Sequence, residues 1–192
     1  MANIIDSPYS RLFIGVQPDQ AAQDFLDKLV DRLGAQPSVQ RTTSTHWTMR
    51  TNRHITLCFL GQTPNQLIPA LKTGLAAISH SNKESLEVAS SLDAFPGNES
   101  NLIAAELVAS EQLKALNQSC SALVKKLGIE TKSRLFRPHI TLARNKDGFG
   151  DFIPIKLNHK INLNNIVLYQ SEPVIDGSSL YTQLQKTRLQ VP

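Results

Sequence analysis

The sequence predicts an α+β fold made of two pseudo-symmetric lobes, each an antiparallel sheet backed by helices, with a central cleft between them. Three observations predict this class. Short strand-like runs alternate with amphipathic helical segments, the two halves of the chain repeat one order of elements, and an identical tetrapeptide occurs in each half. The chain of 192 residues is long enough to bury such a core, so we assign residues 1–192 to a single domain.

The first half of the chain alternates between strand and helix patterns. Short apolar runs indicate buried strands, and apolar residues three and four apart indicate helices. Gly34 suits the end of a helix, and Gly61 is expected to end a strand. The predicted elements are a strand over 11–16, a helix over 21–33, a loop over 36–44, a short strand over 47–49, a strand over 54–60 and a helix over 64–78.

The second half repeats this pattern and adds a late pair of antiparallel strands. Gly128 suits the end of its helix, and Pro138 immediately precedes one of its strands. The predicted elements are strands over 86–95 and 102–108, a helix over 111–127, and strands over 139–143, 161–170 and 180–184.

The composition predicts a cytoplasmic protein without a metal or another cofactor. No run approaches the ~18 consecutive apolar residues of a membrane-spanning helix, and the first residues have no signal-peptide pattern. The two cysteines, Cys58 and Cys120, are therefore expected to be reduced thiols. Neither belongs to a Cys-x-x-Cys or His–Cys cluster that would suggest zinc.

Basic residues are concentrated in two parts of the chain. The net charge is +4 and the isoelectric point is near 9.2. No acidic residue lies between Asp31 and Glu84, and a second basic run over 125–146 contains Glu130 as its one carboxylate. A solvated surface is the common explanation of such runs. Because each run surrounds the same short motif, the distribution favours an anionic ligand.

The repeated tetrapeptide is the feature most suggestive of chemistry. His-Ile-Thr-Leu occupies residues 54–57 and recurs 85 residues later, at 139–142. A single histidine on a half-buried strand is more often a hydrogen-bonded structural residue. Two identical copies at matching places are not explained by core packing, which does not require His and Thr twice. The spacing is too long for a solenoid repeat and suits the duplication of a small α+β unit.

Strand geometry predicts which side chains of the first copy share a face. Residues two apart on a strand point the same way. His54 and Thr56 should therefore face a cleft, while Ile55, Leu57 and Phe59 should pack on helices.

The second copy repeats this arrangement. His139 and Thr141 should share one face, opposite Ile140. Arg137 has the parity of the polar face and is as well explained by a solvated side chain as by a cleft role. Arg144 has the parity of Ile140, which argues against a cleft position.

Two histidines and two threonines suit the hydrolysis of a phosphodiester. The reaction needs a base for water and an acid for the leaving oxygen, and imidazoles with a pKa near ~6.5 supply both at neutral pH. Threonine hydroxyls can donate to phosphate oxygens, and a nearby Arg or Lys can stabilise charge in the transition state. The motifs have no carboxylate cluster of the kind that holds a catalytic metal.

With these motifs the sequence resembles the two-histidine (2H) phosphoesterase superfamily. The resemblance is closest to the RNA 2′,3′-cyclic phosphodiesterases, also called the bacterial and archaeal 2′-5′ RNA ligase family, and it covers essentially the whole chain. The chain departs from the family pattern just before the first motif, where a proline and a glutamate are absent, and over 101–107, where a tryptophan is absent. The matching segments are 11–18, Trp47, Asn52, 54–61, Phe95–Pro96, 134–144, 168–171 and Tyr181.

The resemblance implies hydrolysis of an RNA 2′,3′-cyclic phosphate to a 2′-phosphomonoester, with reverse joining of RNA ends through a 2′-5′ linkage. It implies His54 as proton donor, His139 as proton acceptor, and Thr56 and Thr141 as phosphate ligands. The expected partners are RNA ends or nucleotides with a cyclic phosphate, bound by a monomer without metal or membrane. Two alternatives stay open. One is a 2H phosphodiesterase for 2′-5′ oligoadenylate or ADP-ribose cyclic phosphate, and the other is a non-catalytic module that binds RNA ends.

Six further residues are candidates for substrate binding. Arginines beside the second motif could bind phosphate. The match of Arg144 to the family pattern favours a cleft role although its strand parity does not, and Arg134 could instead pair with a carboxylate. Aromatic side chains could stack on a base, although core packing is the expected role of Phe13. The six candidates are Arg134, Arg137, Arg144, Phe13, Trp47 and Tyr181.

Overall fold

The computed structural model describes residues 7–40, 44–97, 100–131, 135–174 and 179–191, and it confirms the α+β class. The strands are β1 (Tyr9–Pro18), β2 (His46–Trp47), β3 (Ile55–Pro64), β4 (Ser85–Ala94), β5 (Leu102–Val108), β6 (His139–Arg144), β7 (Ile155–Pro173) and β8 (Ser179–Arg188). The helices are α1 (Gln20–Gly34), α2 (Pro37–Gln40), α3 (Ile68–Ser81) and α4 (Glu111–Lys126), with 3₁₀ turns η1 (Arg50–Asn52) and η2 (Asn65–Leu67).

The eight strands form one continuous antiparallel sheet. β1 pairs with β3, β3 with β6, β6 with β5, and β5 with β4. The long strand β7 pairs along its first part with β4 and along its second part with β1, so the path returns to its start. β8 extends the sheet beside β7, and β2 pairs with β6. This order brings the strands with the two motifs next to each other, although 85 residues separate the motifs.

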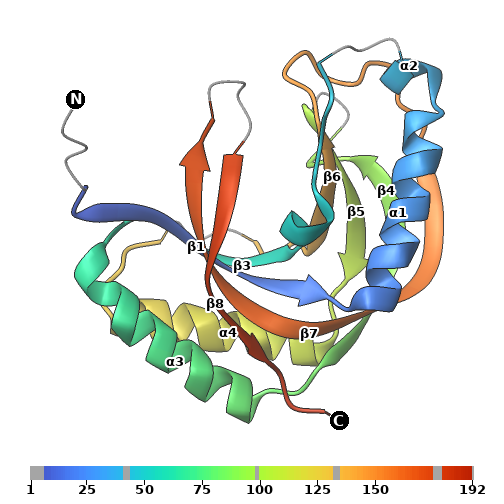
Figure 1. Cartoon of the computed structure of the whole chain (residues 1–192). Coiled ribbons are helices and arrows are strands. Elements are labelled where there is room, and N and C mark those ends of the chain that lie inside the picture. Colours follow the sequence, from blue (N-terminus) through green and yellow to red (C-terminus); the bar gives the residue numbers. More distant parts are fainter. Residues whose placement is uncertain (1–6, 41–43, 98–99, 132–134, 175–178, 192) are drawn as a thin grey trace.

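Helices from each half of the chain pack on strands from the other half. Helices α3 and α4 lie side by side and cover β3, β7 and β8, whereas α1 packs beside β7 at the other end of the molecule (Figure 1). Helix α4 follows the second-half strand β5 in sequence, yet it packs on β3, the strand of the first motif. The two halves of the chain are therefore interleaved.

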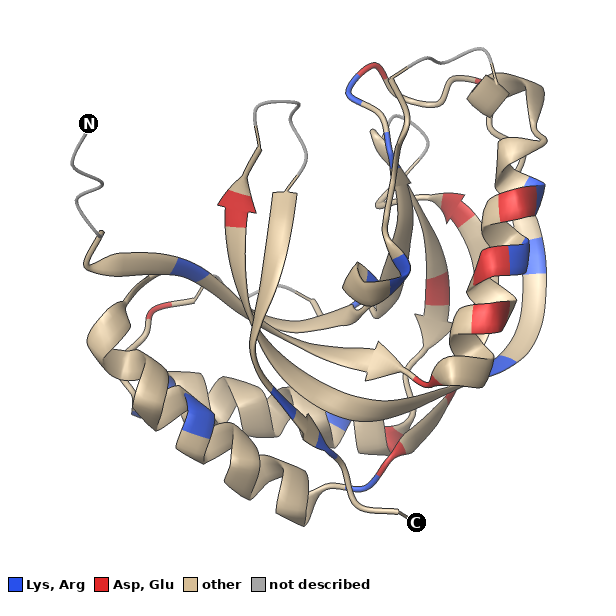
Figure 2. Ribbon diagram, viewed as in Figure 1, with Lys and Arg blue, Asp and Glu red and all other residues tan. Residues whose placement is uncertain are grey.

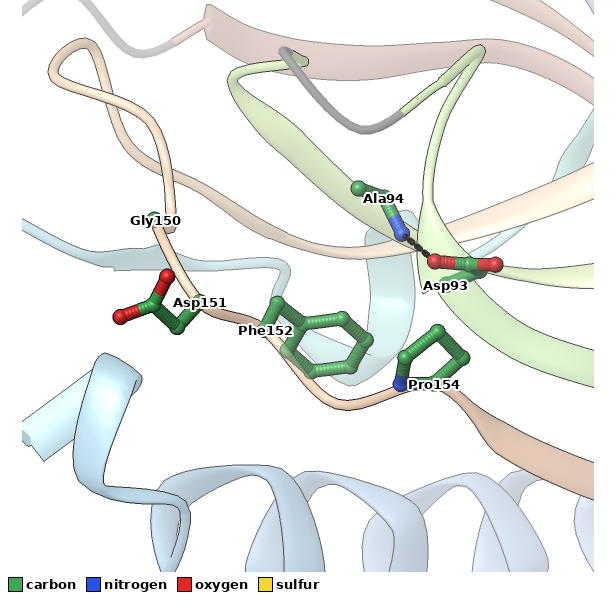
Figure 3. Close-up of a pocket in the computed structure, with 6 residues that line it drawn as sticks. All are labelled: Asp93, Ala94, Gly150, Asp151, Phe152 and Pro154. Carbon is green, nitrogen blue, oxygen red and sulfur yellow. Dashed lines mark hydrogen bonds between the residues drawn. The ribbon is translucent and has the colours of Figure 1, made fainter.

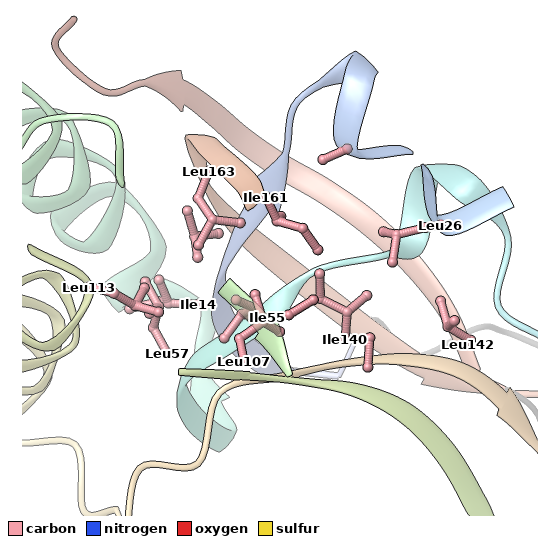
Figure 4. Close-up of a cluster of buried hydrophobic side chains, with 14 of the residues drawn as sticks. Ile14, Leu26, Ile55, Leu57, Leu107, Leu113, Ile140, Leu142, Ile161 and Leu163 are labelled. Carbon is pink, nitrogen blue, oxygen red and sulfur yellow. The ribbon is translucent and has the colours of Figure 1, made fainter. Parts of the chain in front are cut away.

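The core lies between the sheet and these helices. Ile55 and Ile140, from the centres of the two motifs, are fully buried and lie in the same cluster as Leu113 of α4 (Figure 4). Fully burying one such aliphatic side chain contributes roughly 1.5–3 kcal/mol. The apolar positions of both motifs thus anchor the strands and fix which way the polar positions point.

Side-chain caps begin the two long helices that flank the sheet. Asp19 accepts a hydrogen bond from the Ala22 amide at 2.8 Å at the start of α1, and Ser110 accepts one from the Leu113 amide at 3.1 Å at the start of α4. The carboxylate of Glu87, on β4, in turn accepts from the Ser110 hydroxyl at 2.7 Å, which ties α4 to the sheet.

Each predicted helix and strand has a counterpart, but several boundaries are wrong. The polar segment expected to be a loop over 36–44 contains the short helix α2. β3 does not end at Gly61: it continues to Pro64, with Gly61 at a φ of +68° beside an irregularity in the β1–β3 register. The helix expected over 64–78 begins at Ile68, because a 3₁₀ turn precedes it.

The two pseudo-symmetric lobes and the cleft between them stay a prediction. The strands can be grouped around the two parts of β7, with β1, β3 and β8 at one part and β4, β5 and β6 further along the sheet path. Among the described helices, none has the length and apolar character needed to cross a membrane.

Candidate active site

The two motifs meet where β3 pairs with β6. Ile55 is opposite Ile140, and both side chains point into the core. The residues on either side of each isoleucine therefore point to the other face. In an antiparallel pair this register places His54 beside Thr141 and Thr56 beside His139. Four polar motif side chains thus gather on one face, around one strand pairing.

Both histidines are held in the same way by the backbone. Nδ1 of His54 lies 2.6 Å from the carbonyl oxygen of Asn52, and Nδ1 of His139 lies 2.9 Å from that of Arg137. In each case the carbonyl belongs to the residue two positions earlier. A carbonyl oxygen only accepts, so the neutral ring must carry its proton on Nδ1. Nε2 of each ring is then left unprotonated and available to a ligand.

Aromatic rings surround His54. Its ring centroid lies 4.9 Å from that of Phe13, 5.1 Å from Tyr169 and 5.7 Å from Tyr181, in tilted or edge-on contacts. Gly15 leaves room for the ring, since a Cβ there would come within 3.1 Å of His54 Cδ2. Tyr181 thus lies beside the ring of His54, and its binding role stays a prediction. Phe13 is 3% exposed and packs in a small core with Tyr169, which is the packing role expected of it.

His139 has a different neighbourhood, with one stacked ring and an ion pair. The Phe95 ring stacks on it with centroids 3.8 Å apart. The Arg137 guanidinium lies over the Phe95 ring, 4.6 Å from its centroid. It also pairs with the Glu106 carboxylate at 3.1 Å. Arg137 is therefore a neighbour of the site and is not simply solvated.

Burial lowers the pKa of both imidazoles. Desolvation is the largest cause for each, and it lowers the pKa of His54 from 6.5 to about 4. The carbonyl of Asn52 opposes this effect, whereas the charges of His139 and Arg144 add to it. The pKa of His139 is also lowered by burial and by Arg144, with Glu106 acting in the opposite direction. The charge of His139 is among the causes that lower the pKa of His54, which is consistent with the two rings meeting at one site.

Arg144 joins the site although strand parity argued against it. The β5–β6 register shifts between Ile103 and Ala104, so that β6 has an extra residue between Thr141 and Ala143. The successive residues Leu142 and Ala143 are both fully buried. The side-chain alternation is thereby inverted, and the charge of Arg144 acts on both histidines. The parity argument was wrong because a bulge is not visible in the alternation pattern.

A second irregularity moves Phe59 out of the apolar face. The β1–β3 register shifts twice, once before the pair of Phe13 with Phe59 and once after the next pair, Ile14 with Cys58. Phe59 is 61% exposed, and its ring centroid lies 6.0 Å from that of Phe13, on the side of His54. The prediction that Phe59 packs on helices beside Leu57 is therefore wrong, for the same reason as at Arg144.

Of the two remaining binding candidates, Trp47 and Arg134, the structure describes Trp47. It is 40% exposed, and its ring lies beside Gly34 at the end of α1, where an added Cβ would come within 3.8 Å of the ring. Arg134 lies outside the described residues. Thr56 and Thr141 are both partly exposed, as a ligand-binding hydroxyl requires.

Several neighbours of the site were not predicted as functional residues. Tyr169 lies beside His54, and its hydroxyl accepts a hydrogen bond from Gln17 at 2.7 Å; Phe95 and Glu106 lie beside His139. The sequence did contain a signal for Phe95 and Tyr169, because both belong to segments that resemble the family, Phe95–Pro96 and 168–171. Glu106 lacked one, since only its pairing with His139 across β5 and β6 places it there.

A cavity of about 250 Å³ is lined by none of the motif residues and does not suit a phosphate. Asp93 and Asp151 are part of its lining, with the Phe152 ring between them (Figure 3). Two carboxylates would repel an anionic group. The Asp93 carboxylate also accepts a hydrogen bond from the Ala94 amide at 2.7 Å, so it serves the local backbone. Within the described residues, no three His, Cys, Asp or Glu side chains form a group that could hold a metal ion.

Comparison with known proteins identifies the family. The model of the 2′-5′ RNA ligase superfamily matches residues 18–148, a range that contains both motifs. The chain belongs to this superfamily. The match confirms the family resemblance derived from the sequence, down to the 2H phosphoesterase class. No curated protein sequence matches the chain.

Solved structures of other proteins share the fold. TT0787 of Thermus thermophilus is 23% identical with a TM-score of 0.80, over 94% of this chain and 98% of that one. Escherichia coli LigT complexed with 3′-AMP is 21% identical with a TM-score of 0.72, over 94% and 98%. A structure described as a phosphoesterase is 21% identical with a TM-score of 0.73, over 95% and 99%. At these identities the likeness establishes a LigT-like fold.

The buried histidine should make the stability of the protein depend on pH in a defined way. Because the pKa of His54 is about 4 in the folded state and 6.5 when unperturbed, the unfolded state binds a proton first as pH falls. The contribution of His54 to the free energy of unfolding is present above pH ~6.5 and is lost as the pH falls to ~4. The loss is at most about 3 kcal/mol. Denaturant unfolding at pH 7 and pH 4 measures it. His54→Gln is the control: an equal loss of stability in this variant would contradict the prediction.

Proposed function

We propose that this protein hydrolyses RNA 2′,3′-cyclic phosphodiesters to 2′-phosphomonoesters, with His54 as proton donor and His139 as proton acceptor. The observation that carries the proposal is the matched pair of imidazoles on the paired strands β3 and β6. Nδ1 of each ring contacts a backbone carbonyl, which leaves Nε2 unprotonated in the neutral ring. Core packing alone would not need two rings held in the same way. Two groups with the same orientation suit attack and departure on one phosphorus atom.

The proposed reaction uses the two rings in opposite senses. Nε2 of His139 removes a proton from water as the water oxygen attacks phosphorus. The bond from phosphorus to the ribose 3′ oxygen breaks, and His54 gives that oxygen a proton. The product is a 2′-phosphomonoester with a free 3′ hydroxyl. His139 is then protonated and His54 neutral, and exchange with solvent restores the starting state. Thr56 and Thr141 donate to the non-bridging oxygens, and Arg144 stabilises their charge.

Because the pKa of His54 is low, we expect the substrate itself to help protonate this ring. At neutral pH the free protein holds this ring neutral, and a proton donor must be protonated. An anionic phosphate beside the ring favours its charged form and raises the pKa. The substrate and a proton are therefore expected to bind together. Arg144 disfavours a charged histidine in the free protein, and the phosphate charge offsets this effect when it binds.

The ligands of a structural relative are consistent with such a site. Escherichia coli LigT has been solved with 3′-AMP, phosphate, NADP+ and ATP. All of these carry phosphate, and three of them are adenine nucleotides or dinucleotides. A nucleotide phosphate is thus a fitting ligand for the face that carries the two motifs here.

Turnover of defined substrates in excess chelator tests the proposal. We expect 2′,3′-cyclic nucleotides and RNA ends with a cyclic phosphate to yield 2′-phosphomonoesters at an unchanged rate, because the proposed roles are filled by side chains. Loss of activity that a divalent ion restores would refute metal independence. Faster turnover of 2′-5′ oligoadenylate or of ADP-ribose 1″,2″-cyclic phosphate would favour another small substrate. Binding of RNA ends without turnover would favour a non-catalytic module.

The threonines should bind phosphate without transferring protons. Thr56→Val keeps the shape of the side chain and removes its hydroxyl, so we expect a loss of about 10²-fold in kcat, as for one donor to a developing charge. The pH profile of kcat should keep both limbs. Steady-state kinetics from pH 5 to 9 measure this, with Thr63→Val, a buried threonine further along β3, as a control for strand stability. A lost limb in Thr56→Val would contradict the assigned role.

A further inference from the structure

A charged cluster ties the segment before β3 to helix α1. Arg53 directly precedes His54, and its side chain is 5% exposed. The Nη1 atom of Arg53 pairs with the Asp27 carboxylate at 2.6 Å and donates to the Gln23 carbonyl at 3.4 Å. Both partners belong to α1. Because neighbouring strand residues point in opposite directions, the arginine reaches the helix while the histidine reaches the site.

A second arginine binds the same side of the helix. Arg50, at the start of η1, donates to the carboxylates of Asp24 and Asp27. Residues three apart lie on one face of a helix, so the two aspartates form a single acidic surface. Figure 2 shows the acidic positions recurring along α1. The segment from Arg50 to Arg53 is therefore bound to α1 at both of its ends.

The middle of this segment is held from the sheet. The carbonyl oxygen of Thr51 accepts a hydrogen bond from Gln17 Nε2 at 3.2 Å and one from Gln183 Nε2 at 3.4 Å. Gln17 Nε2 also donates to the Tyr169 hydroxyl at 2.7 Å, in the aromatic cluster around the histidine. The next carbonyl along the chain is that of Asn52, which holds Nδ1 of the histidine ring.

We propose that Arg53 and Asp27 form a positioning clamp for His54. The clamp fixes the segment in front of β3, so that the Asn52 carbonyl keeps a proton on Nδ1 and leaves Nε2 as the nitrogen that takes up and donates the catalytic proton. Released from the clamp, the segment would let this carbonyl turn away, and the neutral ring would exchange between its two tautomers. The inference deepens the proposed function and rests on it for the purpose of the fixed ring.

Packing alone explains this cluster less well. The Arg53 side chain is buried, whereas that of Asp27 is 40% exposed. An ion pair that buries a charge is often no more stabilising than apolar residues of similar size, because the buried charge loses its hydration. The Nε atom of Arg53 is buried and has no hydrogen-bond partner among the described residues, which adds to the cost. The pair also lies next to the one peptide carbonyl that orients the histidine. Geometry of the backbone, more than net stability, is what the cluster provides.

The test uses the full chain with Asp27→Asn, and with Arg53→Lys as a variant that keeps the charge. Long-range ¹H–¹⁵N spectra of the imidazoles report the tautomer directly. In the wild type we expect an Nδ1-protonated His54; in Asp27→Asn we expect a mixture, with His139 unchanged as an internal reference. kcat on a 2′,3′-cyclic nucleotide should fall about 10²-fold with KM nearly constant, and Arg53→Lys should recover part of it. Glu84→Gln breaks a remote pair with Arg188 and should change neither reading.

The outcomes separate the clamp from the proposed function. If Asp27→Asn is less stable but keeps the wild-type His54 tautomer and kcat, the clamp is only structural and the inference is wrong. If Glu84→Gln disturbs the tautomer equally, the effect is general and the inference also fails. If the wild type does not hydrolyse cyclic phosphates, the proposed function fails while the spectra still decide whether the clamp fixes the ring.

Discussion

His54→Ala should lose about 10²–10⁴-fold in kcat on a 2′,3′-cyclic phosphate, the usual contribution of a general acid. The same variant should be far less impaired on a nucleoside nitrophenyl phosphodiester. A ribose alkoxide is a poor leaving group and needs a proton, whereas a nitrophenolate departs with little help. Rates on both substrates, measured on variants with unchanged near-ultraviolet circular dichroism, give the comparison.

His139→Ala is the matched counterpart and should be poor on both substrates, because the base that activates water is missing. His80→Ala is the control, since His80 is exposed on α3 and its Nδ1 contacts the Ala76 carbonyl of its own helix at 2.6 Å. If the activated ester restored the activity of His139→Ala and not that of His54→Ala, His139 would be the acid and His54 the base. Equal rescue of both, or of neither, would refute the division into acid and base.

The motif faces were predictable because strand geometry is local. The period of two residues places His and Thr together and the intervening Ile opposite, and the fully buried Ile55 and Ile140 confirm this at both copies. The same rule failed at Phe59 and Arg144, where one strand gains a residue against its partner. A bulge depends on the pairing of two strands, so the pattern of one strand does not reveal it.

The surroundings of the histidines depend on contacts between distant parts of the chain. Tyr169 and Tyr181 reach His54 because β7 and β8 pair with each other and β7 with β1, and Glu106 reaches His139 through the register of β5 and β6. The packing of α4 on β3, a strand from the other half of the chain, is equally a consequence of topology. Amphipathic patterns state that a helix has a buried face, but they do not state which sheet it covers.

Arg144→Met should combine a large kinetic loss with a rise in the pKa of both histidines. We expect kcat/KM to fall about 10²–10³-fold, because charge on the phosphate oxygens loses a fixed cation. The positive charge of Arg144 lowers the pKa of His54 and of His139, so its removal must raise both. Histidine titrations by NMR in the free protein measure this shift independently of activity.

Arg137→Met supplies the contrast that makes this prediction sharp. The charge of Arg137 lowers the pKa of His139 and is not among the causes that act on His54, so this variant should move one titration and not the other. Its kinetic loss should be smaller, since the guanidinium is engaged by Glu106 and Phe95. Arg144→Lys should recover part of the rate and most of both pKa shifts, because it restores the charge without the planar fork of donors. If Arg144→Met left both titrations in place, the bulge in β6 would not direct Arg144 to the histidines, and a kinetic loss would need another cause.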